Sequence, residues 1–241
     1  MKRPKDYLIF PLDVPTYEEA IRYIELLKGH VGYFKVGLEL FVSVGPKILN
    51  AIRKRSGAGV FLDLKFHDIP ATVKNAFLAT STYGVAFTTV HCDEGKGLLR
   101  SVVKNNPSDT KILAVTVLTS LESKDLKELG YLDKYVNDIT ALVMLKARMA
   151  KEAGCSGVVC FGLEVEKVKA GLGKDFIVVT PGIRPAWSLV GKDDQKRIIT
   201  PYQAIKGGAD YIVVGRPIRT AEKPIEATKK VLGEIEMAIS E

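Results

Sequence analysis

Three charged side chains stand close together in the stretch from Asp63 to Pro70. The stretch closes a short apolar run, residues 59–62, which is typical of a buried strand. Because side chains alternate along a strand, Asp63 and Lys65 share one face, and Asp68 lies just beyond. A fixed ammonium beside a carboxylate can stabilise negative charge and donate a proton. Burying these charges is costly unless they are paired, so the pattern indicates chemistry, although a solvated salt bridge would look the same.

The segments around this stretch alternate between strands and helices along the whole chain. We predict strands at residues 7–13, 31–37, 59–65, 86–91, 111–118, 156–161, 176–180 and 210–215. The predicted helices include a long one over 133–153 and others that begin at the capping residues Thr16 and Thr200. Eight β-α units without a linker predict a single (β/α)8 TIM barrel over residues 1–241. An open doubly wound sheet is the competitor, but it has no reason to stop at eight equal units.

Polar residues recur where the predicted strands end, which is the face that holds the active site in such barrels. They are Asp13, Lys35, Asp63, Lys65, His91, Thr119, Arg184, Gly215 and Arg216. The turns after the seventh and eighth strands contain glycine and arginine, a combination suited to a phosphate. The long loop between Arg184 and Ile199 is read as a lid with Gln195 reaching inward, or else as a solvated insertion. His67 and His91 are interpreted as structural, or as residues that support the site, rather than as catalytic, because no nucleophile or metal-ligand set surrounds them.

Composition narrows the function classes. The chain has 241 residues, 46% of them hydrophobic and 26% charged, and no apolar run long enough to span a membrane. The amino-terminal segment does not match a signal peptide, so we expect a cytoplasmic protein. The net charge of +7 is spread along the chain and suits either nucleic acid or a small anionic substrate. The three cysteines show no metal-type spacing.

The sequence closely resembles the orotidine 5′-monophosphate (OMP) decarboxylase family over nearly the whole chain. The matching pieces are Leu12-Asp13, residues 34–37, 61–70, 115–120 and 180–185, Gln195 and residues 214–217. The resemblance implies conversion of OMP to UMP and CO2 in pyrimidine biosynthesis, without metal or organic cofactor. It also implies a homodimer with shared active sites, and neither nucleic acid nor a membrane as a partner. Ala71 and the run Cys92-Asp93-Glu94 depart from the common family pattern.

The family's site residues transfer to this chain position by position. The resemblance implies that Lys65 donates a proton to C6 of the pyrimidine, within a charge network of Lys35, Asp63 and the partner subunit's Asp68. Ribose contacts would come from Asp13, Lys35 and Thr72, and pyrimidine contacts from Thr119 and Ser120. The 5′-phosphate would be held by Arg184, Gln195, Gly215 and Arg216.

Two alternatives remain open. Barrel decarboxylases and aldolases of keto-sugar phosphates share the Asp-x-Lys-x-x-Asp pattern, but they bind Mg²⁺ and typically have Glu where Lys35 stands. An ammonium there would repel the metal, which favours the nucleotide enzyme. A non-enzymatic RNA-binding barrel would explain the basic charge, but it would not need the three charged residues as a set, and the chain shows no basic stripe with stacking aromatics.

Overall fold

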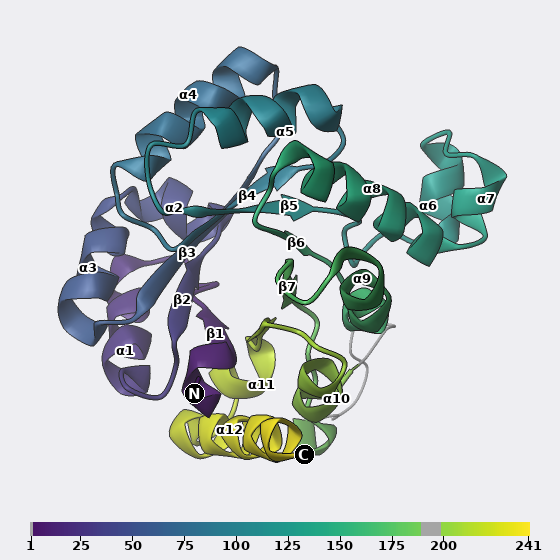
Figure 1. The fold of residues 1–241 in the computed structure, drawn as a ribbon. Coiled ribbons are helices and arrows are strands. Elements are labelled where there is room, and N and C mark those ends of the chain that lie inside the picture. The colour runs from purple at the N-terminus through teal and green to yellow at the C-terminus, as the bar shows by residue number, and fades with distance from the viewer. Residues whose placement is uncertain (1, 189–198) are drawn as a thin grey trace.

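The computed structural model describes residues 2–188 and 199–241, and its strands form a closed parallel barrel (Figure 1). Neighbouring strands pair in sequence order, and the last strand pairs with the first. The strands are β1 (Leu8–Pro11), β2 (Tyr33–Val36), β3 (Gly59–Phe66), β4 (Phe87–His91), β5 (Lys111–Val115), β6 (Gly157–Val159), β7 (Ile177–Thr180) and β8 (Tyr211–Val213). The predicted eight-stranded parallel barrel is confirmed.

Helices surround this barrel in the order that the strand-helix alternation predicts (Figure 1). The α-helices are α1 (Tyr17–Leu27), α2 (Leu38–Val44), α3 (Lys47–Ser56), α4 (Pro70–Ser81), α5 (Gly95–Lys104), α6 (Ser123–Glu128), α7 (Asp133–Val136), α8 (Ile139–Ala153), α9 (Val165–Leu172), α10 (Pro201–Lys206), α11 (Arg216–Arg219) and α12 (Pro224–Ser240). Short 3-10 helices are η1 (Pro4–Tyr7), η2 (Gly162–Glu164) and η3 (Ala186–Ser188).

Two apolar layers hold the barrel together. Inside it, alternate strand residues pack against one another: Ile9, Phe61, Phe87, Leu113, Val179 and Val213. The larger layer lies between the strands and the helices and includes Phe10, Phe34 and Leu62. Because Phe61 belongs to the inner layer and Leu62 to the outer one, the alternation of β3 sends Asp63 and Lys65 to the interior side at the strand's end.

The helix starts follow their capping residues. Thr16 accepts a hydrogen bond from the backbone N–H of Glu19, 3.2 Å away, and thereby caps α1. Thr200 caps α10 in the same way and forms a full capping box with Gln203. Both are among the polar residues that satisfy otherwise unpaired donors at a helix start.

The predicted helix over residues 133–153 is wrong in one respect, because it is divided into α7 and α8. The side chain of Asp138 accepts a hydrogen bond from the N–H of Ala141 and starts α8 afresh. The connection before it contains α6, and α6 and α7 together project from one side of the barrel (Figure 1). Leu129 and Leu132, next to these two short helices, are exposed.

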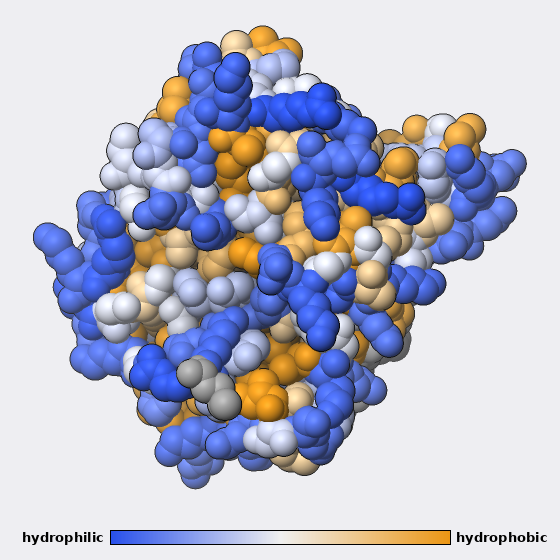
Figure 2. Space-filling model, in the orientation of Figure 1, coloured by the Kyte–Doolittle hydropathy of each residue, from blue (hydrophilic) through white to orange (hydrophobic). Residues whose placement is uncertain are grey.

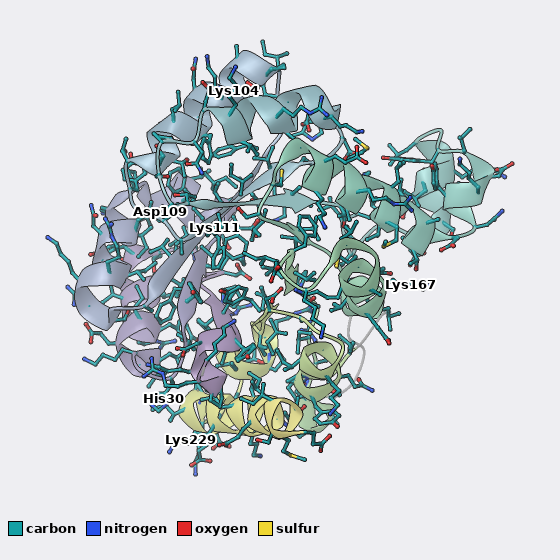
Figure 3. The ribbon with its side chains drawn as sticks, viewed as in Figure 1. His30, Lys104, Asp109, Lys111, Lys167 and Lys229 are labelled. Atoms are coloured by element: carbon teal, nitrogen blue, oxygen red, sulfur yellow. The ribbon has the colours of Figure 1, made fainter. Side chains whose placement is uncertain are left out.

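The surface is polar over most of the face in view, with apolar colour concentrated in small areas such as the tip of the α6–α7 projection (Figure 2). Positive side chains are dispersed. Lys104, Lys167 and Lys229 come from α5, α9 and α12, are all exposed, and lie apart around the outside of the ring of helices (Figure 3). In the described part of the chain, no helix combines the length and the apolar character needed to cross a membrane.

Candidate active site

The Asp63 carboxylate is the centre of the charged cluster at the carboxyl end of the barrel. Its Oδ2 atom lies 2.8 Å from Nζ of Lys65 and 3.7 Å from Nζ of Lys35. Lys35 also lies 3.0 Å from Oδ1 of Asp13, so the four side chains form a chain of alternating charge. Asp63 is only 8% exposed, whereas the side chain of Asp13 is 51% exposed. The arrangement extends from the buried end of β3 to the open mouth of the barrel.

The backbone of β3 is distorted where these side chains stand. Leu62 pairs with Thr88 and Phe66 with Val90, so four residue steps on β3 oppose two on β4. Within this bulge Lys65 has φ 48°, in the left-handed region, and among the described residues it alone does so without being glycine. Such a conformation costs about 1–3 kcal/mol and is found mostly at functional sites. The strained backbone of Lys65 therefore coincides with the charged cluster around Asp63.

The electrostatic environment keeps Asp63 ionised. Burial by itself opposes ionisation of the carboxyl, but the ammonium groups of Lys35 and Lys65 oppose this effect, together with hydrogen bonds from Lys65 and Thr89. The result is that the pKa of Asp63 lies below its usual value. A buried carboxylate is therefore available beside the Lys65 ammonium at neutral pH.

A cavity of about 300 Å³ opens above this cluster, a size suited to a small ligand. Asp13, Lys35, Asp63 and Lys65 line one side of it. Thr119, Arg184, Gly215 and Arg216 also line it. Between the charged groups lie apolar side chains, among them Phe61, Val115, Val159 and Val213. The lining of the cavity therefore combines a carboxylate–ammonium cluster with two arginines.

Eight of the predicted site residues thus lie around one cavity, as the strand-end pattern led us to expect. Asp68, Thr72 and Ser120 are exposed and lie outside this lining in the described part of the chain. Oδ1 of Asp68 accepts a hydrogen bond from the N–H of Ile69, at 2.6 Å. Gln195 lies outside the described residues, so its predicted role and that of the lid stay predictions.

Packing against the neighbouring strand requires a glycine at position 215. A Cβ atom at this position would come within 2.8 Å of Cγ of Pro11, on the neighbouring strand β1. The close approach lets the chain turn directly from β8 into α11, which begins at Arg216. The sequence suggested an anion-binding turn here, but it did not reveal this contact with Pro11.

A second cluster of charge lies beside the site. Lys146, on α8, is 7% exposed and its Nζ donates to the backbone carbonyl of Thr116, at 2.9 Å. The same ammonium contacts Asp93 at 2.5 Å and the Tyr131 hydroxyl at 3.3 Å. Nδ1 of His91 lies 2.6 Å from Asp93. This network connects the ends of β4 and β5 to the α6–α7 projection.

Thr89 is the site residue that the sequence analysis missed. It lies in β4, is fully buried, and its hydroxyl contacts both Asp63 and the backbone of Lys65. The signal was available in principle, because a hydroxyl at an inward position between Phe87 and His91 is unexpected in a barrel lined by apolar side chains. His67, by contrast, lies 3.2 Å from Glu94, and its ring centroid is 5.2 Å from that of His91.

Among residues 2–188 and 199–241, no three His, Cys, Asp or Glu side chains gather in a group suited to a metal ion. The three cysteines are buried free thiols, and burial raises the pKa of each of them. Low reactivity of these thiols follows, since the thiolate is the reactive form.

Comparison with known proteins identifies the family. The model of the Orotidine 5′-phosphate decarboxylase / HUMPS family matches residues 6–231. An orotidine 5′-phosphate decarboxylase of Desulfosudis oleivorans is 50% identical over 239 residues, covering 99% of this chain and 96% of the relative. One of Gloeothece citriformis is 45% identical, covering 95% of this chain and 97% of the relative.

Solved structures agree with the sequence relatives. The crystal structure of orotidine 5′-phosphate decarboxylase from Lactobacillus acidophilus superposes with a TM-score of 0.80 at 36% identity. The match covers 95% of this chain and 98% of that one. Sequence, cavity and barrel therefore lead to one conclusion: the chain belongs to the Orotidine 5′-phosphate decarboxylase / HUMPS family.

Proposed function

We propose that this protein is a carboxy-lyase that converts orotidine 5′-monophosphate to UMP and CO2, with Lys65 as the proton donor. The observation that supports this most directly is the placement of the Lys65 ammonium, 2.8 Å from Asp63 and at the edge of the cavity. The names of the relatives and the family match point to the same reaction. A UMP-forming step places the protein in pyrimidine biosynthesis, and we propose a cytoplasmic location for it.

The chemistry requires stabilisation of a carbanion. When the bond between C6 and the carboxylate breaks, its electron pair stays on C6 in an sp² orbital, without a conventional electron sink. The Lys65 ammonium stabilises this charge and then transfers a proton from Nζ to form the C6–H bond of UMP. The resulting neutral amine recovers its proton from solvent. Asp63, held ionised beside it, would repel the substrate carboxylate and disfavour the bound substrate relative to the transition state.

The substrate's other groups would be held at a distance from the bond that breaks. Lys35 and Asp13 would bind the ribose hydroxyls, and Arg184 and Arg216 the 5′-phosphate, by charge-assisted hydrogen bonds. Thr72, Thr119, Ser120, Gln195 and Gly215 complete the proposed set of substrate contacts. Binding energy from the remote phosphate can then be used for positioning at C6.

Lys35 distinguishes this reaction from a metal-dependent one on keto-sugar phosphates. Its ammonium lies 3.0 Å from Asp13 and 3.7 Å from Asp63, so it occupies the space beside both carboxylates. A divalent cation placed there would face a fixed positive charge. This contact favours the metal-free decarboxylation.

The test is the loss of absorbance when purified protein is mixed with orotidine 5′-monophosphate. We expect turnover, and we expect it to survive exhaustive chelation. Absence of turnover would contradict the proposed function. A strict requirement for Mg²⁺ would instead move the assignment to the sugar-phosphate branch.

We propose further that the active sites are shared across a homodimer. Asp68 is exposed beyond the end of β3, and Ile69, which follows it, is 66% exposed although it is apolar. Both features suit a loop that a second copy of the chain covers. The partner's Asp68 would then complete the charge network around Lys65.

Mixing two inactive variants tests this arrangement. Lys65→Ala and Asp68→Ala chains should each be nearly inactive, but a mixed dimer has one site with both lesions and one with neither. With random exchange half of the dimers are mixed, so activity should return to roughly a quarter of wild type. Exchange is achieved by mild unfolding and refolding of the two variants together, and a tagged copy confirms it. If well-exchanged mixtures stay inactive, Asp68 acts within its own chain or the dimer is wrong.

A further inference from the structure

Thr89 lies in the middle of β4 and faces the interior of the barrel, directly beside the bulge of β3. It is 0% exposed, as is its neighbour Thr88, whose side chain faces the opposite side of the strand. A buried hydroxyl needs hydrogen-bond partners, or it destabilises the fold. The partners of Thr89 are both members of the charged pair.

The two hydrogen bonds of Thr89 use both of its capacities. Its Oγ1 donates to Oδ1 of Asp63 at 2.9 Å. The same atom accepts from the backbone N–H of Lys65, also at 2.9 Å. The direction of each bond follows from its partner. An ionised carboxylate can only accept, so the single hydroxyl proton of Thr89 goes to Asp63, and an amide N–H can only donate, so the Thr89 oxygen accepts from Lys65.

Together these bonds compensate for an interruption of the backbone pairing between β3 and β4. In the bulge between Leu62 and Phe66 the normal pairing with β4 is interrupted. The N–H of Lys65 has no regular ladder position there, and the Thr89 side chain accepts its proton instead. Because Lys65 has φ 48°, this bond also helps to stabilise a backbone conformation that lysine seldom adopts.

We infer that Thr89 is a positioning residue, whose hydroxyl sets the orientation of the Asp63 carboxylate and of the Lys65 backbone as one unit. Oδ2 of Asp63 is bound to the Lys65 ammonium and Oδ1 to Thr89, which fixes the plane of the carboxylate. Without the hydroxyl the carboxylate can rotate, and the Lys65 backbone loses the partner of its N–H. The expected loss of turnover rests on the proposed function of Asp63 and Lys65. The expected effect on the orientation of these two residues does not depend on that function.

The charged groups around Asp63 predict a second consequence. Lys35 from β2, Lys65 from β3 and Thr89 from β4 face it, and Asp13 lies on the other side of Lys35. The hydrogen bond from Thr89 is one of the interactions that hold the pKa of Asp63 low against the effect of burial. Its removal should therefore raise this pKa.

The experiment compares Thr89→Val with Thr88→Val. Valine has nearly the shape of threonine, so each variant replaces a hydroxyl by a methyl group and changes little else. Oγ1 of Thr88 is buried without a hydrogen-bond partner in the described structure, so its loss should leave activity unchanged. For Thr89→Val we expect kcat to fall by roughly ten- to a hundredfold, at about 1.4 kcal/mol for each factor of ten, with KM little changed. Thr89→Ser, which restores the hydroxyl, should recover most of the activity.

Two further measurements separate positioning from a loss of folding. The acid limb of the kcat/KM profile should move to higher pH in Thr89→Val, while thermal unfolding should show that the variant is folded at the assay temperature. Titration of the Asp63 carboxyl by ¹³C NMR gives the same pKa shift without any substrate. It therefore tests the effect on the pair even if wild type fails to decarboxylate OMP, which would refute the proposed function alone.

The inference is overturned if Thr89→Val matches Thr88→Val in kcat and in the pKa of Asp63. It is also overturned if activity falls only in proportion to lost folded protein, with the pKa of Asp63 unchanged and no recovery in Thr89→Ser. A raised pKa together with recovery by serine supports it.

Discussion

Replacing Lys35 by methionine should disable the site while leaving the barrel folded. The Lys35 side chain is 13% exposed, and its ammonium lies between Asp13 and Asp63. Methionine keeps an unbranched side chain of similar length, so the variant removes charge with little change in volume. The four charged side chains that line this part of the cavity then change from a net charge of zero to one negative charge.

Two effects are expected, one on stability and one on turnover. Breaking a buried ion pair by removing one partner costs about 3–5 kcal/mol of folding free energy. Asp63 keeps the Lys65 ammonium at 2.8 Å, which reduces that cost, and Asp13 is 51% exposed, so the loss of its pair adds at most about 1 kcal/mol. For kcat/KM we expect a separate loss of about 3 kcal/mol, on the order of a hundredfold, which is the scale of removing one preorganised charged contact, and the uncompensated negative charge also repels the anionic substrate.

The assay follows decarboxylation of OMP across a range of pH. The pKa of Asp63 lies below its usual value in wild type, chiefly because Lys35 and Lys65 outweigh the effect of burial. The ionised form is then present above that lowered pKa and is lost as pH falls through it. Without Lys35 the pKa rises, so the acid limb should move to higher pH. Lys28→Met, which breaks the exposed pair with Glu25, is the matched control. A loss below fivefold with an unmoved acid limb would refute this reasoning.

Three further predictions address other parts of the site. Lys65→Ala should lose almost all turnover while UMP binding survives, and near-normal turnover would remove Lys65 from its proposed role. Arg216→Ala should cost about 2–4 kcal/mol in kcat/KM for OMP but much less for orotidine without the phosphate, whereas equal losses would place Arg216 away from the phosphate. Lys146→Met should lower the free energy of unfolding, measured with urea, by about 2–4 kcal/mol, because it leaves Asp93 and the Thr116 carbonyl without their shared donor. Lys96→Met, at the exposed pair with Glu152, should change it by less than about 1 kcal/mol, and equal effects would contradict the importance of burial.

The barrel and much of the cavity could be predicted because both depend on local patterns. Alternation of strands and helices predicts a parallel barrel, and parallel strands place their carboxyl ends at one face. Asp13, Lys35 and Lys65 are distant in sequence, yet each stands at or near such an end, and the structure brings them to one cavity. The prediction needed only the position of each residue within its own strand.

The remaining features depend on how separate segments meet. The role of Thr89 requires the bulge that offsets β3 against β4, and pairing register is not visible in either strand alone. The contact between Gly215 and Pro11 arises only when the barrel closes. The break between α7 and α8 has a local signal in the capping residue Asp138, but the apolar pattern continues across it and concealed the boundary.

The charges that line the cavity are of two kinds, and both enter the proposed mechanism. In the cluster around Asp63, two carboxylates and two ammonium groups balance, and the proposed Asp68 of the partner subunit would add a further negative charge. Such a cluster would have no net attraction for the carboxylate of the substrate. The arginines Arg184 and Arg216 line the same cavity, and in the proposed function they would attract the phosphate. Because this attraction would act on a group that does not react, it could hold the substrate carboxylate against Asp63 in the ground state, and the repulsion would be relieved as CO2 departs.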